Sequence, residues 1–427
     1  MDVALTTYRA AIDALFTRTT GVWKLGLERV NALLELLGNP HRTLTVLHVG
    51  GTNGKGSVVA TAEAVLRQRG LRVGRYTSPH LIDFRERILV DRVPIGEEAV
   101  LDFLERWMPD AERLGATFFE ITTALALDHF AKSEVDVAIV EVGLGGRLDA
   151  TNVVDPRAAV VTSIALDHTE WLGDSVDAIA HEKAGIFKPR RAAVIGERDP
   201  GIVELLSRIA TSREARPVVR VRDRGDITAV RTTMDGTSFT IDGGNRVHVH
   251  TPLPGAHQAQ NAVTALAALD TAGLAPWPEG AESIVIPPVA LPGRFQRVGR
   301  RIFDVAHNPS GADMLAATIL VVEPPRPLVA LLAVLADKDW KSIMSALARV
   351  ADDVVLTRPP SAPVSRAWNL DEALGFARTL SWRAVAEPSF DDALARADAT
   401  GATTLITGSF HTVGDAMVRL QVNPLAG

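Results

Sequence analysis

Residues 50–57 read Gly-Gly-Thr-Asn-Gly-Lys-Gly-Ser, a combination typical of a phosphate-binding loop. The four glycines allow backbone N–H groups to turn toward an anion. Lys55 adds a positive charge for phosphate, and Ser57 offers a hydroxyl to a metal ion. The apolar residues 44–49 lead into this stretch and a helix-like segment leads out of it. We therefore predict a strand, a phosphate loop and a helix.

The loop departs from the common Walker A pattern GxxxxGK[ST]. That pattern has Gly where Val49 stands, and Ser or Thr where Gly56 stands. A glycine-rich turn without a ligand is the alternative interpretation, but it leaves Lys55 and Ser57 without a role. Phosphate binding is therefore the favoured interpretation.

Other residues with chemical potential follow further apolar segments. Glu141 lies near the end of residues 135–142, where a carboxylate beside a phosphate loop is well placed to hold magnesium. His168 follows residues 158–166. A lone histidine is more often structural, but parallel strands end at one edge of a sheet, and this convergence favours a ligand role. Lys183 is either a surface charge or a cation that stabilises the anions of this site.

The segments that position these residues alternate between helical and strand patterns, which indicates an α/β fold. Two helices are expected within residues 4–37, with a break near Thr19-Thr20-Gly21. Further helices are expected at 58–68, 97–114, 118–133 and 255–269, and strands at 44–49, 72–76, 135–142 and 158–166.

Two domains are expected. Residues 217–250 alternate short strands with turn residues, so we expect them to add an antiparallel edge to the mostly parallel sheet of a phosphate-loop domain. The proline-rich residues 277–292 indicate a linker. We place the first domain at residues 1–290 and a smaller, Rossmann-like α/β domain at 291–427. The strands of the second domain are expected near 301–306, 328–335, 352–357, 382–386 and 403–407.

Composition narrows the class of protein further. The formal net charge of -6 argues against a general nucleic-acid binder. The absence of cysteine excludes disulfides and thiolate chemistry, and it fits a reducing cytoplasm. The first residues lack the pattern of a signal peptide, and the longest apolar run, residues 328–336, is too short to span a bilayer. We therefore expect a cytoplasmic protein with neither a membrane nor a nucleic acid as partner.

The sequence also contains nine blocks in this order: GTNGKGS, TSPHL, EVGLGGRLDATN, LDHTEWLG, HEKAGI, HQAQNA, LPGRFQ, DVAHNP and GSFHTVG. Together they resemble the Mur-ligase superfamily and, within it, the folylpolyglutamate synthase/dihydrofolate synthase family. The resemblance covers nearly the whole chain, and nine ordered blocks are much more specific than the phosphate loop alone. It implies a monomeric, ATP-dependent amide ligase that joins L-glutamate to dihydropteroate and to tetrahydrofolates through an acyl phosphate.

The resemblance also implies roles for matching residues. Catalysis is expected from Lys55, His168 and Lys183. ATP contacts are expected from Thr52, Asn53, Gly54, Lys55, Gly56, Ser57, Asn261, Arg294 and Asp304. Two Mg²⁺ ions are expected, with ligands from Ser57, Ser78, Glu141, His168 and Lys183, and K⁺ is left open as a further ion. Lys183 matches a lysine that is often carbamylated, which would make it an anion, the opposite of the cation inferred above. For Asn261, helix capping is the ordinary alternative.

The remaining implied contacts concern the other substrates. Pteroate or folate binding is expected from Thr117, Phe118, Phe119, Glu120, Leu148, Asp149 and Ala150. Glutamate binding is expected from His307 and Ser409. Core packing explains the two phenylalanines equally well.

Several alternatives remain open. One is a folylpolyglutamate synthase without the dihydropteroate reaction. Another is a cell-wall ligase of the same superfamily, although such relatives place a separate domain before the phosphate loop and only 49 residues precede Gly50 here. A nucleotide-binding switch would not need Arg294 and Asp304. An NAD oxidoreductase is disfavoured because the glycines near 143–148 do not form the dinucleotide fingerprint.

Overall fold

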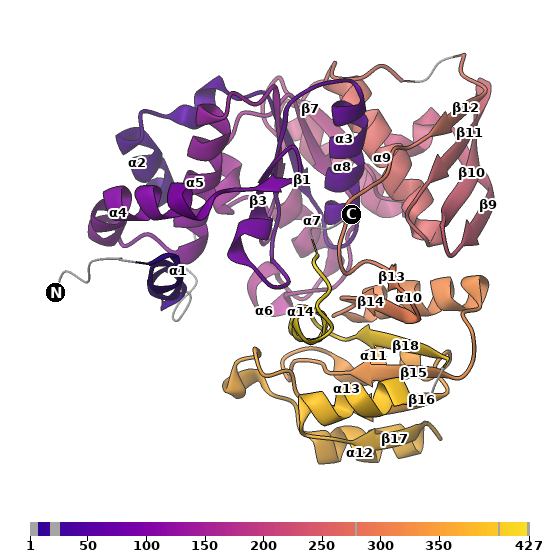
Figure 1. Ribbon diagram of the computed structural model, residues 1–427. Helices are drawn as coiled ribbons and strands as arrows, with labels where there is room; N and C mark the ends of the chain where they lie inside the picture. The colour runs from indigo at the N-terminus through magenta and orange to yellow at the C-terminus, as the bar shows by residue number, and fades with distance from the viewer. Residues whose placement is uncertain (1–6, 18–25, 278–279, 400–401, 425–427) are drawn as a thin grey trace. The chain divides into compact units, whose positions relative to one another are not determined.

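The computed structural model describes residues 7–17, 26–277, 280–399 and 402–424 (Figure 1). The chain divides into two compact units. Unit 1 comprises Met1–Asp226, Ile241–Val247 and Gln260–Pro287, and unit 2 comprises Ile227–Thr240, His248–Ala259 and Pro288–Gly427. The helix break expected near Thr19-Thr20-Gly21 lies outside the described residues.

Unit 1 contains an eight-stranded sheet in the order β4-β3-β2-β5-β1-β6-β7-β8. The six strands from β2 to β8 in this order run parallel, and every residue of β1 and β5 is buried, as expected for parallel strands covered on both faces. The strands span Val46–Gly50 (β1), Val73–Tyr76 (β2), Ile88–Val90 (β3), Val93–Pro94 (β4), Val137–Glu141 (β5), Ala158–Val161 (β6), Ala192–Ile195 (β7) and Val218–Arg220 (β8).

Helices cover both faces of this sheet. The first helix after the phosphate loop, α3, packs on β1, β2 and β5. The opposite face carries two hydrophobic cores, one shared with α1, α2, α4 and α5 and the other with α7 and α8. The helices span Tyr8–Phe16 (α1), Glu28–Leu36 (α2), Lys55–Gln68 (α3), Glu97–Leu114 (α4), Phe118–Lys132 (α5), Thr169–Leu172 (α6), Val176–Ala184 (α7), Pro200–Ser212 (α8) and Ala256–Thr271 (α9). Short 3-10 helices span Pro40–Thr43 (η2), Phe84–Arg87 (η3), Ala150–Val153 (η4) and Val221–Arg224 (η5).

The antiparallel edge exists, but our placement of it was wrong. Its strands are β3 and β4, which pair antiparallel beyond β2. Most of residues 217–250 instead form a separate four-stranded sheet, β12-β11-β10-β9, because their short strands pair with one another. Only β8 from that region joins the large sheet. The strands of the separate sheet span Asp226–Thr233 (β9), Gly236–Gly243 (β10), Asn245–Thr251 (β11) and Ser283–Val285 (β12).

Unit 2 contains a six-stranded sheet in the order β13-β14-β18-β15-β16-β17. In this sheet only β13 is antiparallel to its neighbour. A hydrophobic core lies between the sheet and α10, α11 and α12, and α13 and α14 also pack on strands of the sheet. The strands span Gln296–Val298 (β13), Arg301–Asp304 (β14), Leu328–Leu332 (β15), Asp353–Leu356 (β16), Arg383–Ala386 (β17) and Thr403–Thr407 (β18). The helices span Pro309–Val322 (α10), Trp340–Leu347 (α11), Val364–Arg366 (η6), Leu370–Thr379 (α12), Phe390–Ala399 (α13) and Phe410–Arg419 (α14).

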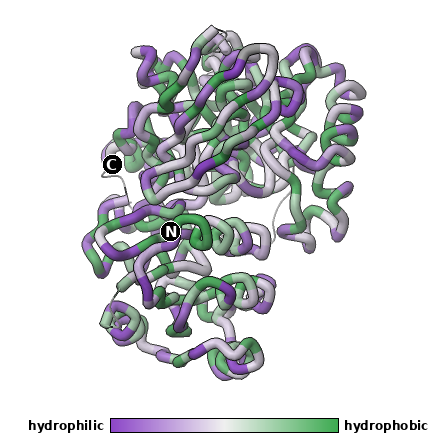
Figure 2. Tube along the Cα trace, turned by 90° about the vertical axis from the view of Figure 1, so that its right-hand side faces the viewer, coloured by the Kyte–Doolittle hydropathy of each residue, from purple (hydrophilic) through white to green (hydrophobic). Residues whose placement is uncertain are grey.

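Hydropathy follows this architecture. Figure 2 shows hydrophobic and hydrophilic residues interleaved along much of the chain. Helices α4 and α14 each bury one apolar face, whereas most residues of α5 are buried. None of the helices in the described part of the chain is long and apolar enough to cross a membrane.

Candidate active site

The phosphate loop lies between β1 and α3, and two of its glycines have backbone angles that favour glycine. Gly51 has a φ of 139° and Gly54 a φ of 87°. Neighbouring side chains also occupy the space that a larger residue would need. A Cβ atom at Gly51 would overlap the hydroxyl of Thr162, and one at Gly54 would lie 2.5 Å from Asn261 Oδ1. The structure therefore brings Asn261 against the loop, although 207 residues separate it from Gly54 in the sequence.

Two hydroxyl residues that follow β6 fix the shape of the loop. The hydroxyls of Thr162 and Ser163 donate hydrogen bonds to the carbonyl oxygen of Asn53, at 2.7 and 3.0 Å. The N–H of Thr52 donates to the Ser163 carbonyl oxygen at 2.6 Å. We did not identify Thr162 and Ser163 from the sequence. The available signal was a Thr-Ser pair within an apolar segment. This pair lies beside the phosphate loop because β6 pairs directly with β1 and both strands end at the same edge of the sheet.

A buried carboxylate supports the loop that follows β6. Glu197 accepts hydrogen bonds from the N–H groups of Ile164, Arg198 and Asp199, at 2.6, 2.6 and 3.0 Å. Its carboxylate thereby joins the segments that follow β6 and β7. Sequence reasoning missed Glu197 because all three partners are backbone groups, which leave no pattern in the sequence.

Two lysines meet on one carbonyl oxygen of the phosphate loop. Lys55 Nζ donates to the carbonyl oxygens of Gly51 and Thr52, each at 3.0 Å, and Lys183 Nζ donates to the same Gly51 oxygen at 3.0 Å. Lys183 is 6% exposed. Burial, followed by the nearby charge of Lys55, lowers the pKa of Lys183 to about 7. Near neutral pH, Lys183 is therefore divided between the ammonium and the neutral amine.

The other expected metal ligands lie near the same edge of the sheet. Glu141 is the last residue of β5, is buried, and pairs with Val49 of β1. Ser57 is buried in the first turn of α3, and Ser78 lies two residues beyond β2. His168 comes seven residues after the end of β6, in the left-handed region at φ 52°, with its side chain 40% exposed.

Within the described residues, no group of three His, Cys, Asp or Glu side chains is arranged to hold a metal ion alone. A metal at this edge would need ligands from a hydroxyl or from a bound substrate.

Two of the residues expected to bind pteroate serve the start of α5. The Thr117 hydroxyl accepts from the Glu120 N–H at 3.3 Å, and the Glu120 carboxylate accepts from the Thr117 N–H at 2.7 Å. This reciprocal arrangement is a capping box. Glu120 also pairs with Arg29 at 3.0 Å. Both side chains thus have a structural role in fixing where α5 begins.

Phe118 and Phe119, which lie between Thr117 and Glu120 in the sequence, pack against different neighbours. The Phe118 ring stacks on Phe16 with centroids 5.0 Å apart, and the guanidinium of Arg87 lies 5.2 Å from its centroid. The Phe119 ring lies 6.0 Å from the Tyr76 ring and fills the space beside Gly143, where a Cβ atom would overlap it. Core packing accounts for most of these contacts.

The segment that contains Leu148, Asp149 and Ala150 is held by a buried polar network. The Asp149 carboxylate accepts from the N–H groups of Leu144 and Thr151, at 2.8 and 3.0 Å, and from the Thr151 hydroxyl. The Thr151 hydroxyl in turn contacts His48 Nε2 at 2.9 Å. Burial raises the pKa of Asp149 and lowers the pKa of His48 to about 3. Asp149 therefore orders the segment after β5 through its own hydrogen bonds.

In unit 2, Asp304 organises the residues around Arg294. Asp304 ends β14 and accepts hydrogen bonds from the N–H groups of Phe295 and Ala306, at 2.8 and 2.9 Å. Burial raises the pKa of Asp304, while the charge of Arg294 acts in the opposite direction. The guanidinium of Arg294 lies 5.5 Å from the centroid of the Phe410 ring.

The expected glutamate-binding residues follow neighbouring strands of unit 2. His307 comes three residues after β14, and its ring lies 5.6 Å from the Phe410 ring. Ser409 comes two residues after β18 and caps α14, accepting from the Thr412 N–H at 3.1 Å. Because β14 and β18 pair in parallel, His307 and Ser409 lie at the same edge of this sheet.

Taken together, a strand, a glycine-rich anion loop and a helix at the carboxyl edge of a parallel sheet define a nucleotide-binding α/β protein. Comparison with known proteins narrows this class. Residues 49–269 match the Mur ligase middle domain, and residues 293–410 match the Mur ligase glutamate ligase domain. The chain is 39% identical to the dihydrofolate synthase/folylpolyglutamate synthase of Escherichia coli K12, over 92% of this chain and 90% of that protein. The chain belongs to the Mur ligase family, within its dihydrofolate synthase/folylpolyglutamate synthase branch.

Solved structures agree with this assignment. The fold matches Mycobacterium tuberculosis folylpolyglutamate synthase complexed with ADP, with a TM-score of 0.86 and 33% identity over 99% of this chain and 100% of that one. It matches E. coli FolC in complex with DHPP and ADP, with a TM-score of 0.83 and 35% identity over 99% of both chains. It also matches a bifunctional folylpolyglutamate synthase/dihydrofolate synthase with Mn, AMPPNP and L-glutamate bound, with a TM-score of 0.79 and 34% identity over 98% of this chain and 99% of that one.

Proposed function

We propose that this protein is an ATP-dependent ligase that adds L-glutamate to dihydropteroate and to reduced folates through an acyl phosphate. The observation that carries the proposal is the phosphate loop on which Lys55 and Lys183 converge, in a chain whose relatives carry these two activities in their names. ATP is the phosphoryl donor, and the cytoplasm is the expected compartment. A monomer is the expected state.

The chemistry explains why such a site is needed. A carboxylate resists attack by an amine, so it is first converted to an acyl phosphate, and phosphate then leaves as the amine of glutamate attacks. When the acyl phosphate forms, the γ-phosphoryl group of ATP must be held in line with the attacking carboxylate and its charge must be balanced. We assign the charge balance to Lys55, whose present bonds to Gly51 and Thr52 would be exchanged for bonds to phosphate oxygens. Backbone N–H groups of the glycine loop orient the phosphates.

The residues at the carboxyl edge of the eight-stranded sheet fit a magnesium site in which the substrate supplies the remaining ligands. Mg²⁺ prefers oxygen ligands and is usually bound by one or two carboxylates together with substrate phosphates and water. Glu141 and Ser57 supply oxygen donors, Ser78 and His168 are the further candidates, and the shortage of clustered carboxylates agrees with a metal that arrives with ATP. When bound, Mg²⁺ would neutralise charge on the transferring phosphoryl group.

Lys183 is proposed to carry a carbamate. A carbamate forms when a neutral amine attacks CO₂ and loses a proton, so a lysine must be partly deprotonated to react. The pKa of about 7 meets this requirement, whereas an ordinary lysine near 10.5 would be almost entirely charged at pH 7. The modified side chain would be an anion able to hold a second Mg²⁺. A dependence on K⁺ stays a separate proposal.

The remaining substrate contacts are assigned from the hydrogen bonds and packing described for the candidate active site. Asn261 lies against the phosphate loop and is assigned to ATP. Asp304 holds the N–H of Phe295, the residue next to Arg294, so we assign Asp304 to positioning Arg294 for ATP. His307 and Ser409 are assigned to glutamate. The segments around residues 117–120 and 148–150 are assigned to the pterin-bearing substrate.

The first test removes the charge of the phosphate loop. Lys55→Ala is expected to abolish ADP release while circular dichroism and the thermal midpoint stay unchanged. Lys132→Ala is the matched control, because Lys132 is a lysine of unit 1 whose side chain is 68% exposed. Near-normal turnover of Lys55→Ala would overturn the assignment of the phosphate loop.

The second test concerns the carbamate. Lys183→Ala is expected to lose activity and to regain part of it when acetate or propionate is added to stand in for the carbamate. Rescue should be absent in Lys55→Ala, which lacks a different group. Full activity without the lysine, or no rescue by any short carboxylate, would contradict the carbamate.

A further inference from the structure

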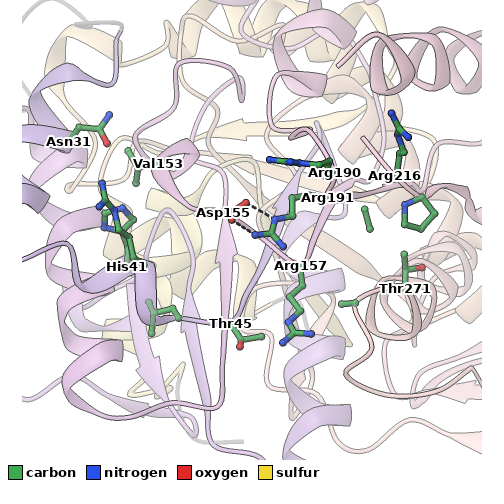
Figure 3. Close-up of a pocket in the computed structure, with 15 residues that line it drawn as sticks. Asn31, His41, Thr45, Val153, Asp155, Arg157, Arg190, Arg191, Arg216 and Thr271 are labelled. Atoms are coloured by element: carbon green, nitrogen blue, oxygen red, sulfur yellow. Dashed lines mark hydrogen bonds and ion pairs between the residues drawn. The ribbon is translucent and has the colours of Figure 1, made fainter. Parts of the chain in front are cut away.

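A cavity of about 750 Å³ lies in unit 1 at the amino edge of the eight-stranded sheet (Figure 3). Its walls come from η2, from the segments that precede β1, β6, β7 and β8, and from single residues of α2, η4 and the end of α9. The phosphate loop follows the carboxyl end of β1, five residues away along the strand, which separates the two sites by about 15 Å. The cavity is therefore distinct from the candidate active site.

The strand register places arginines side by side in this cavity. Ala158 of β6 pairs with Ala192 of β7, so the preceding residues Arg157 and Arg191 are neighbours. Ala193 pairs with Val218 of β8, so Arg216 continues the row. Adjacent strands are about 4.8 Å apart, so the backbones of these three arginines lie close together. Their side chains extend in different directions around the cavity, as Figure 3 shows for Arg157, Arg191 and Arg216.

The lining of the cavity carries little negative charge. Arg42 and Arg190 also line the cavity, and Asp155 is the single acidic residue among the described lining residues. Asp155 is bound by Arg191 through two hydrogen bonds, one of them 2.7 Å long, as Figure 3 shows. Within the described parts of the chain, Arg42, Arg157, Arg190 and Arg216 form no ion pair within 4.0 Å, although the charge of Arg190 also helps to lower the pKa of Asp155.

Five arginines thus face one carboxylate, in a protein whose formal net charge is -6. His41 also lines the cavity, and burial together with the charge of Arg42 lowers its pKa, which favours the neutral ring.

We propose that this cavity binds a small multivalent oxyanion, such as a polyphosphate or a polycarboxylate, through Arg157, Arg190 and Arg216. Guanidinium groups form paired hydrogen bonds to both kinds of oxyanion. A concave site of this size suits a small ligand, whereas an extended basic surface would suit nucleic acid. Neither the family assignment nor the proposed ligase reaction requires this site.

The test measures binding away from the phosphate loop. Tripolyphosphate and tri-γ-glutamate are titrated by calorimetry into full-length Lys55→Ala protein and into wild-type protein saturated with Mg-ADP, with acetate as the monovalent reference. The variants are Arg157→Ser/Arg216→Ser and, as the matched control, Arg69→Ser/Arg208→Ser, which removes two exposed arginines of unit 1 outside the cavity. Circular dichroism and the thermal midpoint verify folding.

We expect at least one trivalent probe to bind more tightly than acetate. The cavity variant should weaken that binding at least about tenfold, and the control should change it less than about twofold. Asp155→Asn should tighten binding, because it removes the one opposing charge and frees Arg191. The probe that binds distinguishes a polyphosphate from a polycarboxylate. The proposal is overturned if neither probe exceeds acetate, if cavity and control variants lose affinity equally, or if Asp155→Asn leaves affinity unchanged or weaker.

Discussion

Replacing Lys183 by methionine should change the pH dependence of stability by a predictable amount. Burial and Lys55 lower the pKa of Lys183 from 10.5 to about 7. Because the folded pKa lies below the unfolded one, the unfolded chain binds more protons between pH 7 and 10.5, and this group makes stability rise with pH in that window. Between pH 7 and 9 this group should raise the free energy of unfolding by about 2 kcal/mol. A full proton of difference would contribute about 1.4 kcal/mol per pH unit, and the total is smaller because Lys183 is still half protonated in the folded state at pH 7.

The assay is urea unfolding of wild-type and Lys183→Met protein at pH 7, 8 and 9 in CO₂-free buffer, followed by tryptophan fluorescence. Lys183→Met lacks the titrating group, so its stability relative to wild type should improve by about 2 kcal/mol as the pH falls from 9 to 7. A constant offset from the lost bond to Gly51 does not affect this difference. Bicarbonate should then stabilise only the wild type. A stability difference independent of pH would refute the lowered pKa and, with it, the basis for the carbamate.

Three further predictions concern the supports of the phosphate loop. Gly54→Ala should lower ATP affinity more than tenfold, measured by calorimetry, because its Cβ would lie 2.5 Å from Asn261 Oδ1. Gly70→Ala is the control, because Gly70 has a similar φ of 80° and no atom within 4 Å of the added Cβ. Equal effects of the two substitutions on stability and ATP binding would contradict a role for the contact with Asn261. Glu197→Gln should destabilise the protein by about 1–3 kcal/mol in urea unfolding, since one amide cannot accept all three backbone N–H bonds as well as a carboxylate, and an unchanged midpoint would count against it. Thr162→Val should raise KM for ATP with little change in overall stability, because it removes the hydroxyl bond to the loop; an unchanged KM would show that the bond is dispensable.

Much of the fold was predictable because its signals are local. Continuous apolar segments and glycine-rich turns indicated the strands of the parallel sheet and the phosphate loop. Residues 217–250 were assigned to the wrong sheet because alternating strands show that pairing occurs without showing the partner. The true antiparallel edge, β3 and β4, consists of strands of three and two residues, too short for a clear period.

The positions of candidate residues could be predicted where they follow from the local sequence, and not where they depend on tertiary contacts. The apolar segments before them placed Lys55 between a strand and a helix and Glu141 near the end of a strand, and the structure has Lys55 as the first residue of α3 and Glu141 as the last of β5. Thr162 and Glu197 were not, because they act on backbone groups brought near only by folding. The charge state of Lys183 also depends on burial and on Lys55, neither of which the local sequence shows.

The reaction proposed for this chain is formation of an amide bond to glutamate, driven by conversion of ATP to ADP. The most direct measurement is ADP release by the purified protein with Mg²⁺, L-glutamate and either dihydropteroate or a tetrahydrofolate, tested separately and with each substrate omitted in turn. We expect ADP release in both reactions, only when glutamate and the pterin substrate are both present, with one glutamate added to the product per ADP. ADP release independent of glutamate, or no release with either pterin substrate, would contradict the proposed reaction.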